Sequence, residues 1–204
     1  MTQGLLVYCD FESEVGYAWT LIESFARVNA RSISIGRGFS FSSSLNAKSP
    51  RQKWGAYRLS LHQMRQLYLV DKQLTSNAMW RATCNFDSSA SSNYFSTKDY
   101  LRGQFSIFNI LTYSSLTGDC FLVDSVSIRG HYCQRCMVPF WAGRDVHLHI
   151  DSSGQCCTRH FYDSLDSEDN FGYYYPYNMA FSCTATGDST TNWWIGGKVH
   201  GNEL

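Results

Sequence analysis

Hydrophobic and polar residues alternate along short stretches of this chain, which is typical of half-buried β-strands. Residues 5–11 and 19–25 form two such stretches on either side of a turn at 14–16, and they predict an opening hairpin. Three later strands are predicted from alternation and from β-branched or aromatic side chains, at 79–86, 121–128 and 145–150. The pattern therefore favours a sheet of many short strands.

One segment has helical spacing instead. Within 61–69 the apolar residues recur on one face of a helix, and Ser60 before them can accept a hydrogen bond as the N-cap. These apolar residues are Leu61, Met64, Leu67 and Tyr68. One short helix among many strands and long polar loops predicts an α+β fold with a central antiparallel sheet and few short helices.

The remaining segments are predicted to be loops. Serine-rich stretches at 39–49 and 87–96 show no periodicity, and the chain after Asp151 is rich in Gly, Ser, Asp and Tyr. An irregular region of that length in a compact domain is usually functional, or is held by a ligand or a disulfide. No internal repeat or linker interrupts the chain, so residues 1–204 are expected to form one domain.

Charge and composition exclude several classes of protein. The chain has 17 Lys and Arg against 17 Asp and Glu, so it lacks the basic surplus that nucleic-acid binding usually requires. Aromatic residues make up 16% of the chain, which argues against disorder. No apolar run approaches the roughly 18 residues of a membrane span. The start lacks the features of a signal peptide, and we expect a secreted chain that is truncated at one or both ends.

The cysteine content points to an oxidising compartment. Eight cysteines in 204 residues are an even number and more than a reduced cytosolic domain usually carries. Disulfides and an extracellular location are therefore expected. The candidates for pairing are Cys9, Cys84, Cys120, Cys133, Cys136, Cys156, Cys157 and Cys183.

An acidic segment in the irregular tail is a candidate metal site. Asp166, Glu168, Asn170 and Gly172 alternate, so two carboxylates and two carbonyl oxygens can converge on one cation. Such oxygen donors suit Ca²⁺, which takes about six to eight of them. The spacing is not that of an EF-hand, because the sixth residue counted from Asp166 is Phe171 rather than Gly. A solvated acidic turn is the alternative interpretation.

A second cluster raises the question of zinc. It consists of Cys133, Cys136, His147, His149, Cys156, Cys157 and His160. Thiolates and imidazoles are zinc ligands, but a His pair separated by one residue lies on one face of a strand and lacks the zinc-finger spacing. Disulfides and ordinary strand histidines are the favoured interpretation. A redox pair at Cys133 and Cys136 is weaker still, because no βαβ pattern surrounds it.

Aromatic residues are concentrated near the C-terminus. They are Phe171, Tyr173, Tyr174, Tyr175, Tyr177, Trp193 and Trp194. Exposed aromatic rings can stack on sugars or hold a peptide, but large aromatic residues are more often part of the core. The chain has no Gly-x-Ser-x-Gly, His-Glu-x-x-His or phosphate-loop motif. We therefore do not expect an enzyme.

Several of these segments resemble the fibrinogen C-terminal domain family, in the family's order. The resemblance lies in Tyr-Cys-Asp at 8–10, Ala-Trp-Thr-Leu-Ile at 18–22, the helical region at 57–64, the acidic run at 166–170 and Asn-Trp-Trp at 192–194. Ala18 stands where the family has Gly. More narrowly, segments 80–84, 128–130, 147–149 and 190–197 resemble fibrinogen-like extracellular proteins of corals and their relatives, including skeletal matrix proteins.

The resemblance implies a function in extracellular recognition. It implies calcium at Asp166 and Glu168, with main-chain oxygens of Asn170 and Gly172 as further ligands. It also implies a pocket for acetylated sugars or peptide termini beside the aromatic pair, lined by Trp193, Trp194 and His200. The expected partner is a glycan or an extracellular protein. The alternative is a structural matrix protein that binds no small ligand.

The chain departs from the family near its C-terminus. The family has a Cys shortly after the paired tryptophans that pairs with the equivalent of Cys183, whereas this chain continues Ile-Gly-Gly-Lys-Val-His at 195–200. The resemblance therefore implies another partner for Cys183, and Cys156 or Cys157 is expected. Cys9 is expected to pair with a cysteine upstream of this chain.

Overall fold

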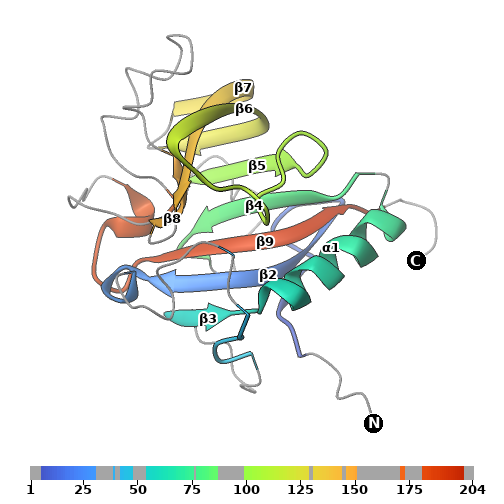
Figure 1. Cartoon of the computed structure of the whole chain (residues 1–204), viewed down its shortest axis with the longest axis horizontal. Helices are drawn as coiled ribbons and strands as arrows, with labels where there is room; N and C mark the ends of the chain where they lie inside the picture. Colours follow the sequence, from blue (N-terminus) through green and yellow to red (C-terminus); the bar gives the residue numbers. More distant parts are fainter. Residues whose placement is uncertain are drawn as a thin grey trace.

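The computed structural model describes residues 6–30, 39, 42–47, 54–75, 77–86, 99–128, 131–143, 146–150, 171–172 and 181–199. Strands account for 49% and helical segments for 16% of this structure, with one α-helix, so the fold is mainly β (Figure 1). The predicted α+β class is therefore wrong. Its error has a physical cause, because strands that are buried on both faces do not show the polar alternation from which strands were counted.

The elements follow one another along the chain with connections of very different lengths. They are β1 (Cys9–Asp10), β2 (Tyr17–Ala26), the 3₁₀ turn η1 (Arg27–Asn29), β3 (Ala56–Arg58), α1 (Leu61–Leu74), β4 (Met79–Cys84), β5 (Tyr100–Gln104), β6 (Ser115–Ile128), β7 (His131–Gly143), β8 (Val146–Ile150), the 3₁₀ turn η2 (Ser182–Thr184) and β9 (Thr190–Lys198). The predicted opening hairpin is present as β1 and β2, and the strands predicted at 79–86, 121–128 and 145–150 correspond to β4, β6 and β8.

All described strands belong to one antiparallel sheet. Its order is β1-β2-β9-β4-β5-β6-β7-β8, with β3 paired to β2. The last strand in sequence, β9, lies between β2 and β4, as its red arrow between the blue and green arrows shows (Figure 1). Residues from opposite ends of the chain are thereby brought together in the middle of the sheet.

Strand β9 was not predicted, and its burial explains why. Residues 190–197 are all buried, so neither face of the strand is exposed to solvent there. Sequence reasoning assigned this segment to an irregular tail. Gly196 shows how closely the strands pack, because a Cβ at this position would lie 2.0 Å from the carbonyl oxygen of Ala18 on β2.

The helix begins where the sequence predicts and ends later. Ser60 caps α1 by accepting a hydrogen bond from the Gln63 backbone N–H, and the Gln63 side chain accepts one from the Ser60 N–H. This capping box fixes the first turn. The helix continues to Leu74 and packs beside β9, with Met64 as its buried residue. Among the described residues no helix has the length and apolar character needed to cross a membrane.

Candidate functional site

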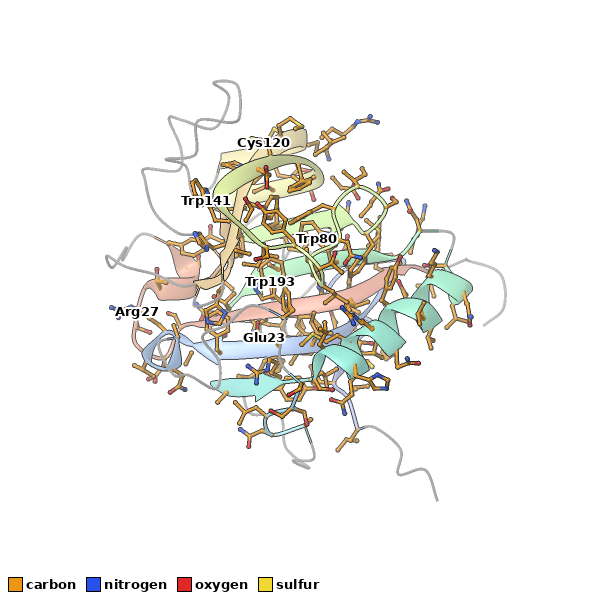
Figure 2. All side chains as sticks on the ribbon, in the orientation of Figure 1. Glu23, Arg27, Trp80, Cys120, Trp141 and Trp193 are labelled. Atoms are coloured by element: carbon orange, nitrogen blue, oxygen red, sulfur yellow. A yellow bond between two sulfur atoms is a disulfide. The ribbon has the colours of Figure 1, made fainter. Side chains whose placement is uncertain are left out.

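The paired tryptophans lie at the centre of the sheet. Neighbouring residues on a strand point to opposite faces, so Trp193 and Trp194 enter different layers of the core. Their exposed fractions are 1% and 0%. Figure 2 shows Trp193 in the middle of the molecule near Trp80, and the two ring centroids lie 6.1 Å apart. Stacking on a sugar needs an exposed ring face, and neither paired tryptophan offers one.

Trp193 holds the residues that directly follow the acidic segment. Its Nε1–H donates a hydrogen bond of 3.1 Å to the carbonyl oxygen of Phe171. Phe171 is fully buried and has a φ of 63°, a conformation that is uncommon outside glycine. Its ring meets that of Phe181 edge to face. The acidic run at 166–170 is therefore followed directly by a residue that is anchored to strand β9.

Gly172 completes this anchor against β8. A Cβ at Gly172 would lie 2.4 Å from the Cβ of His149 and 2.5 Å from the carbonyl oxygen of Leu148. Those distances are far inside normal contact, so only glycine fits without displacing the strand. Gly172 is the one predicted calcium ligand among the described residues, because Asp166, Glu168 and Asn170 lie outside them, as does His200.

Trp194 packs on a buried arginine on the other face of the sheet. The guanidinium carbon of Arg81 lies 4.6 Å from the Trp194 ring centroid and 4.8 Å from that of Trp19. A cation between two indole faces is stabilised by both rings. The Nε1–H of Trp194 donates to Oγ1 of Thr83 at 3.0 Å. The second tryptophan is therefore also committed to internal contacts.

Arg81 connects the N-terminal hairpin to the sheet. Its Nη2 donates to Oδ2 of Asp10 at 2.6 Å, and its Nη1 donates to Oγ of Ser13 at 2.9 Å. Burial on its own would raise the pKa of Asp10, but the Ser13 hydrogen bonds and the charge of Arg81 outweigh burial and hold that pKa below its ordinary value. Asp10 is thus a buried carboxylate that stays ionised.

Glu14, in the turn between β1 and β2, accepts a second set of buried hydrogen bonds. Its Oε2 accepts hydrogen bonds of 3.0 Å from Nε1 of Trp19 and from the hydroxyl of Tyr100, and its Oε1 accepts from Arg102. Burial raises the pKa of Glu14, against the opposing charges of Arg102 and Arg81. Sequence reasoning did not identify Asp10, Glu14 or the two arginines as a group. The one available signal was that Asp10 and Trp19 belong to the Tyr-Cys-Asp and Ala-Trp-Thr segments.

Two buried titratable side chains, Glu23 and His147, lie near Arg58. Glu23 on β2 pairs in register with Arg58 on β3, and burial raises the pKa of Glu23 to about 8 despite the arginine charge. His147 on β8 stacks on Phe25 at 4.4 Å, and burial lowers the pKa of His147 to about 3. Within the described chain, Oε1 of Glu23 and Nε2 of His147 are buried without a hydrogen-bond partner. Both groups are therefore neutral near pH 7.

Disulfides are present as the sequence predicts, but the partner of one cysteine differs from the prediction. Cys84 pairs with Cys183, although Cys156 or Cys157 was expected to take that place. The turn η2 packs against the end of β4, which brings these two sulfurs together across 99 residues of sequence. The partner expected for Cys183 was therefore wrong, and Cys156 and Cys157 themselves lie outside the described residues.

Of the remaining described cysteines, three form disulfides and one is a free thiol. Cys133 pairs with Cys136, and Cys120 is also disulfide-bonded. The Cys133–Cys136 bond consumes both thiolates that a zinc site would need, and no cluster of three or more His, Cys, Asp or Glu side chains suited to a metal occurs in the described part of the chain. Cys9 is a free thiol in this structure, and its expected pairing with a cysteine upstream of the chain stays a prediction.

The described residues thus form a closely packed core, with a free thiol, two neutral titratable groups and an anchored pair, Phe171 and Gly172, next to the acidic run at 166–170. Rigid scaffolds of this kind position loops for binding. Comparison of the chain with known proteins finds no family model, no curated protein and no solved structure that matches it.

Proposed function

We propose that this chain is an extracellular recognition domain of the fibrinogen-related type, which binds a glycan or an extracellular protein through its acidic segment. Disulfides are typical of proteins that fold in an oxidising compartment, and Cys84–Cys183 and Cys133–Cys136 support that location. The order of the fibrinogen-like segments along the chain supports the family assignment. The proposal concerns binding, because no nucleophile or acid–base motif suggests a reaction.

The hydrogen bond from Trp193 to Phe171 is the observation that carries this proposal. A binding loop works best when its ends are fixed, because ordering a mobile segment costs free energy on binding. Here Phe171, which directly follows the acidic run at 166–170, is fixed to β9, and Gly172 is enclosed by β8. The tryptophan that the family resemblance assigns to the pocket would therefore act by positioning the loop, without touching the ligand.

Calcium fits the chemistry of this segment. Asp166 and Glu168 would supply carboxylates, and Asn170 and Gly172 would supply main-chain carbonyl oxygens, all of which are hard oxygen donors. When bound, Ca²⁺ would neutralise the two carboxylates and order the loop. Glu168 has one methylene more than Asp, which changes the size of the site. The loop would then present its polar groups to the ligand from a fixed position.

A structural matrix protein is the second candidate. The full burial of Trp193 and Trp194 favours it, since the stacking surface of a sugar pocket is missing from both rings. In this alternative the acidic segment and the disulfides only stiffen the domain.

Glycan binding in calcium separates the two candidates. The purified chain with intact disulfides is applied to an array of acetylated glycans in Ca²⁺ and in chelator, together with the variants Asp166→Asn and Asp188→Asn. Asp188 is an exposed acidic residue before β9 and serves as the matched control. Recognition predicts calcium-dependent binding that Asp166→Asn abolishes and Asp188→Asn retains. Absence of binding in both conditions would favour the structural alternative.

A further inference from the structure

The disulfide between Cys133 and Cys136 holds a contracted stretch of strand β7. The two Cα atoms lie 6.2 Å apart. An extended strand would separate residues three positions apart by about 10 Å, at roughly 3.3 Å per residue. The disulfide therefore spans a segment that is shorter than a regular strand by more than one residue's rise.

The backbone conformation of Arg135 shortens this stretch of β7. Its φ of 52° is in the left-handed region, which side chains other than glycine adopt at a cost. The pairing of β6 with β7 is interrupted at the same place: Cys136 pairs with Val123 and Gln134 with Ser125, and Arg135 between them has no partner in the register. The strand thus gives up regular pairing where the disulfide closes.

This stretch lies on an exposed edge of the sheet. Among the described residues, β8 pairs with β7 only between Phe140 and Gly143, so the edge at 132–138 is uncovered by β8. Gln134 and Arg135 are exposed, and Tyr132 and Met137 are 57% and 45% exposed. Cys133 is half-buried and its sulfur lies beside these exposed residues. A reagent in solution can therefore approach Cys133.

The Cys84–Cys183 disulfide offers a contrast within the same molecule. Both of its cysteines are buried, with exposed fractions of 0% and 1%. It joins β4 to η2 in the core, so a reductant reaches it only when the surrounding structure opens. Access is one of the factors that set the rate of thiol–disulfide exchange. The two disulfides should therefore differ strongly in reactivity.

We propose that Cys133–Cys136 is a reversible thiol–disulfide exchange site, reduced by an external dithiol while Cys84–Cys183 stays oxidised, and that its reduction lets β7 extend. Two observations carry this: Cys133 is half-buried beside exposed residues of β7 while Cys136 is 9% exposed, and the oxidised strand is held contracted around a left-handed arginine. The reductant belongs to the class of small dithiols or dithiol proteins. The site is independent of the proposed recognition function.

The exchange proceeds in two balanced steps. A thiolate of the reductant attacks Sγ of Cys133, the bond to Sγ of Cys136 breaks, and Cys136 leaves as a thiolate that takes up a proton. The second thiol of the reductant then loses its proton and attacks the mixed disulfide, which releases Cys133 as a thiolate that is protonated in turn. Two electrons pass to the protein disulfide, and the reductant becomes a disulfide. The positive charge of Arg135 favours approach of the anionic thiolate.

The test measures which disulfide is reduced first. A Cys9→Ser background removes the free thiol that the described residues contain. The folded protein is equilibrated in reduced and oxidised dithiothreitol at graded ratios, alkylated, digested and analysed by mass spectrometry. We expect Cys133 and Cys136 to be labelled at ratios that leave Cys84 and Cys183 unlabelled. Labelling of all four cysteines together, in step with loss of the folded circular dichroism signal, would overturn the proposal.

Two substitutions at Arg135 separate backbone strain from charge. Arg135→Gly removes the cost of the left-handed conformation in the oxidised form, so reduction should become less favourable by roughly five- to thirtyfold in its equilibrium constant. Arg135→Gln keeps the backbone cost and removes the charge, so the equilibrium should stay the same while exchange with anionic thiols slows. An unchanged equilibrium in Arg135→Gly would contradict the contraction as the source of reactivity.

Discussion

Arg81 on strand β4 forms a buried hydrogen-bonded ion pair with Asp10 of the N-terminal hairpin, with 2.6 Å between Nη2 and Oδ2. The guanidinium also lies between the rings of Trp19 and Trp194. The contact crosses 71 residues of sequence and fixes how the hairpin packs on the sheet. A buried ion pair in this setting specifies the arrangement of segments that apolar packing alone would fix less precisely.

Loss of one partner should therefore be costly. Asp10→Asn leaves the arginine charge buried, and we expect a loss of about 3 kcal/mol in the free energy of unfolding, the lower end of the range for broken buried pairs because Glu14 lies 3.9 Å from Arg81. Urea denaturation measures it. Glu12→Gln, an exposed acid in the same turn, is the control and should change stability by less than about 0.5 kcal/mol. Equal effects of the two variants would contradict the role of the pair.

Glu23 should make the protein less stable as the pH rises. Its folded pKa of about 8 is above its unfolded value, so the folded state holds a proton that the unfolded state releases above about pH 4.5. Stability from this group is complete below that pH and falls by about 1.4 kcal/mol per pH unit up to about pH 8. Chemical denaturation at several pH values between about 6.5 and 8 should show this slope in the wild type. In Glu23→Gln the slope should be absent, and its persistence would show that other groups cause it.

His147 should have the opposite effect on the acid side. Its folded pKa of about 3 is below the unfolded value of about 6.5, so the unfolded state binds a proton that the folded state excludes. Stability from this group is complete above about pH 6.5 and falls by about 1.4 kcal/mol per pH unit as the pH drops to about 3. Between about pH 4.5 and 6.5 the slopes of Glu23 and His147 cancel, and these two groups together give a plateau there.

His147→Phe tests the acid limb while keeping the ring that stacks on Phe25. The same denaturation series should show less loss of stability between about pH 6.5 and 3 in this variant than in the wild type. A series parallel to the wild type would mean that His147 titrates normally in the folded protein.

Local signals in the sequence identified several elements correctly. The spacing of apolar residues and the Ser60 cap predicted the start of α1, and alternation predicted the hairpin and three more strands. The end of α1 was set too early. Its C-terminal part carries Val70 and Leu74 on the surface, so the apolar face that defined the helix no longer continues there.

Long-range features could not be read from the sequence. β9 is buried on both faces, and its place between β2 and β4 depends on partners more than 100 residues away. No pattern in the sequence indicates that Asp10 is the partner of Arg81, because an ion pair between distant residues leaves no periodic signal along the chain. The Cys84–Cys183 pairing likewise follows from the packing of η2 on β4. Four cysteines already allow three pairings, so the number of cysteines alone cannot select one.

Substitution of Trp193 should weaken calcium binding by the acidic segment, whereas substitution of Trp194 should not. Trp193→Phe removes the hydrogen bond to Phe171 and keeps an aromatic ring, so we expect a cost of about 1 kcal/mol or more in unfolding free energy. Calcium affinity should fall several-fold because the end of the loop is released. Trp194→Phe removes an equivalent hydrogen bond to Thr83 and is the matched control. It should lower stability by a similar amount and leave calcium affinity unchanged; equal losses of affinity would contradict the coupling.

Calcium should stabilise the folded protein through Asp166. Ligand that binds only the folded state at 100 times its dissociation constant adds about 2.7 kcal/mol, which raises the melting temperature of a domain of this size by roughly 5 to 10 °C. Thermal unfolding in Ca²⁺ and in chelator should show that shift in the wild type and in Asp188→Asn, but not in Asp166→Ala. Mg²⁺ at the same concentration should give a smaller shift, because it requires a tighter octahedral site than flexible loop carboxylates offer. A shift that survives in Asp166→Ala would place the cation elsewhere, and no shift in any variant would leave the buried anchor at Phe171 and Gly172 as a purely structural contact.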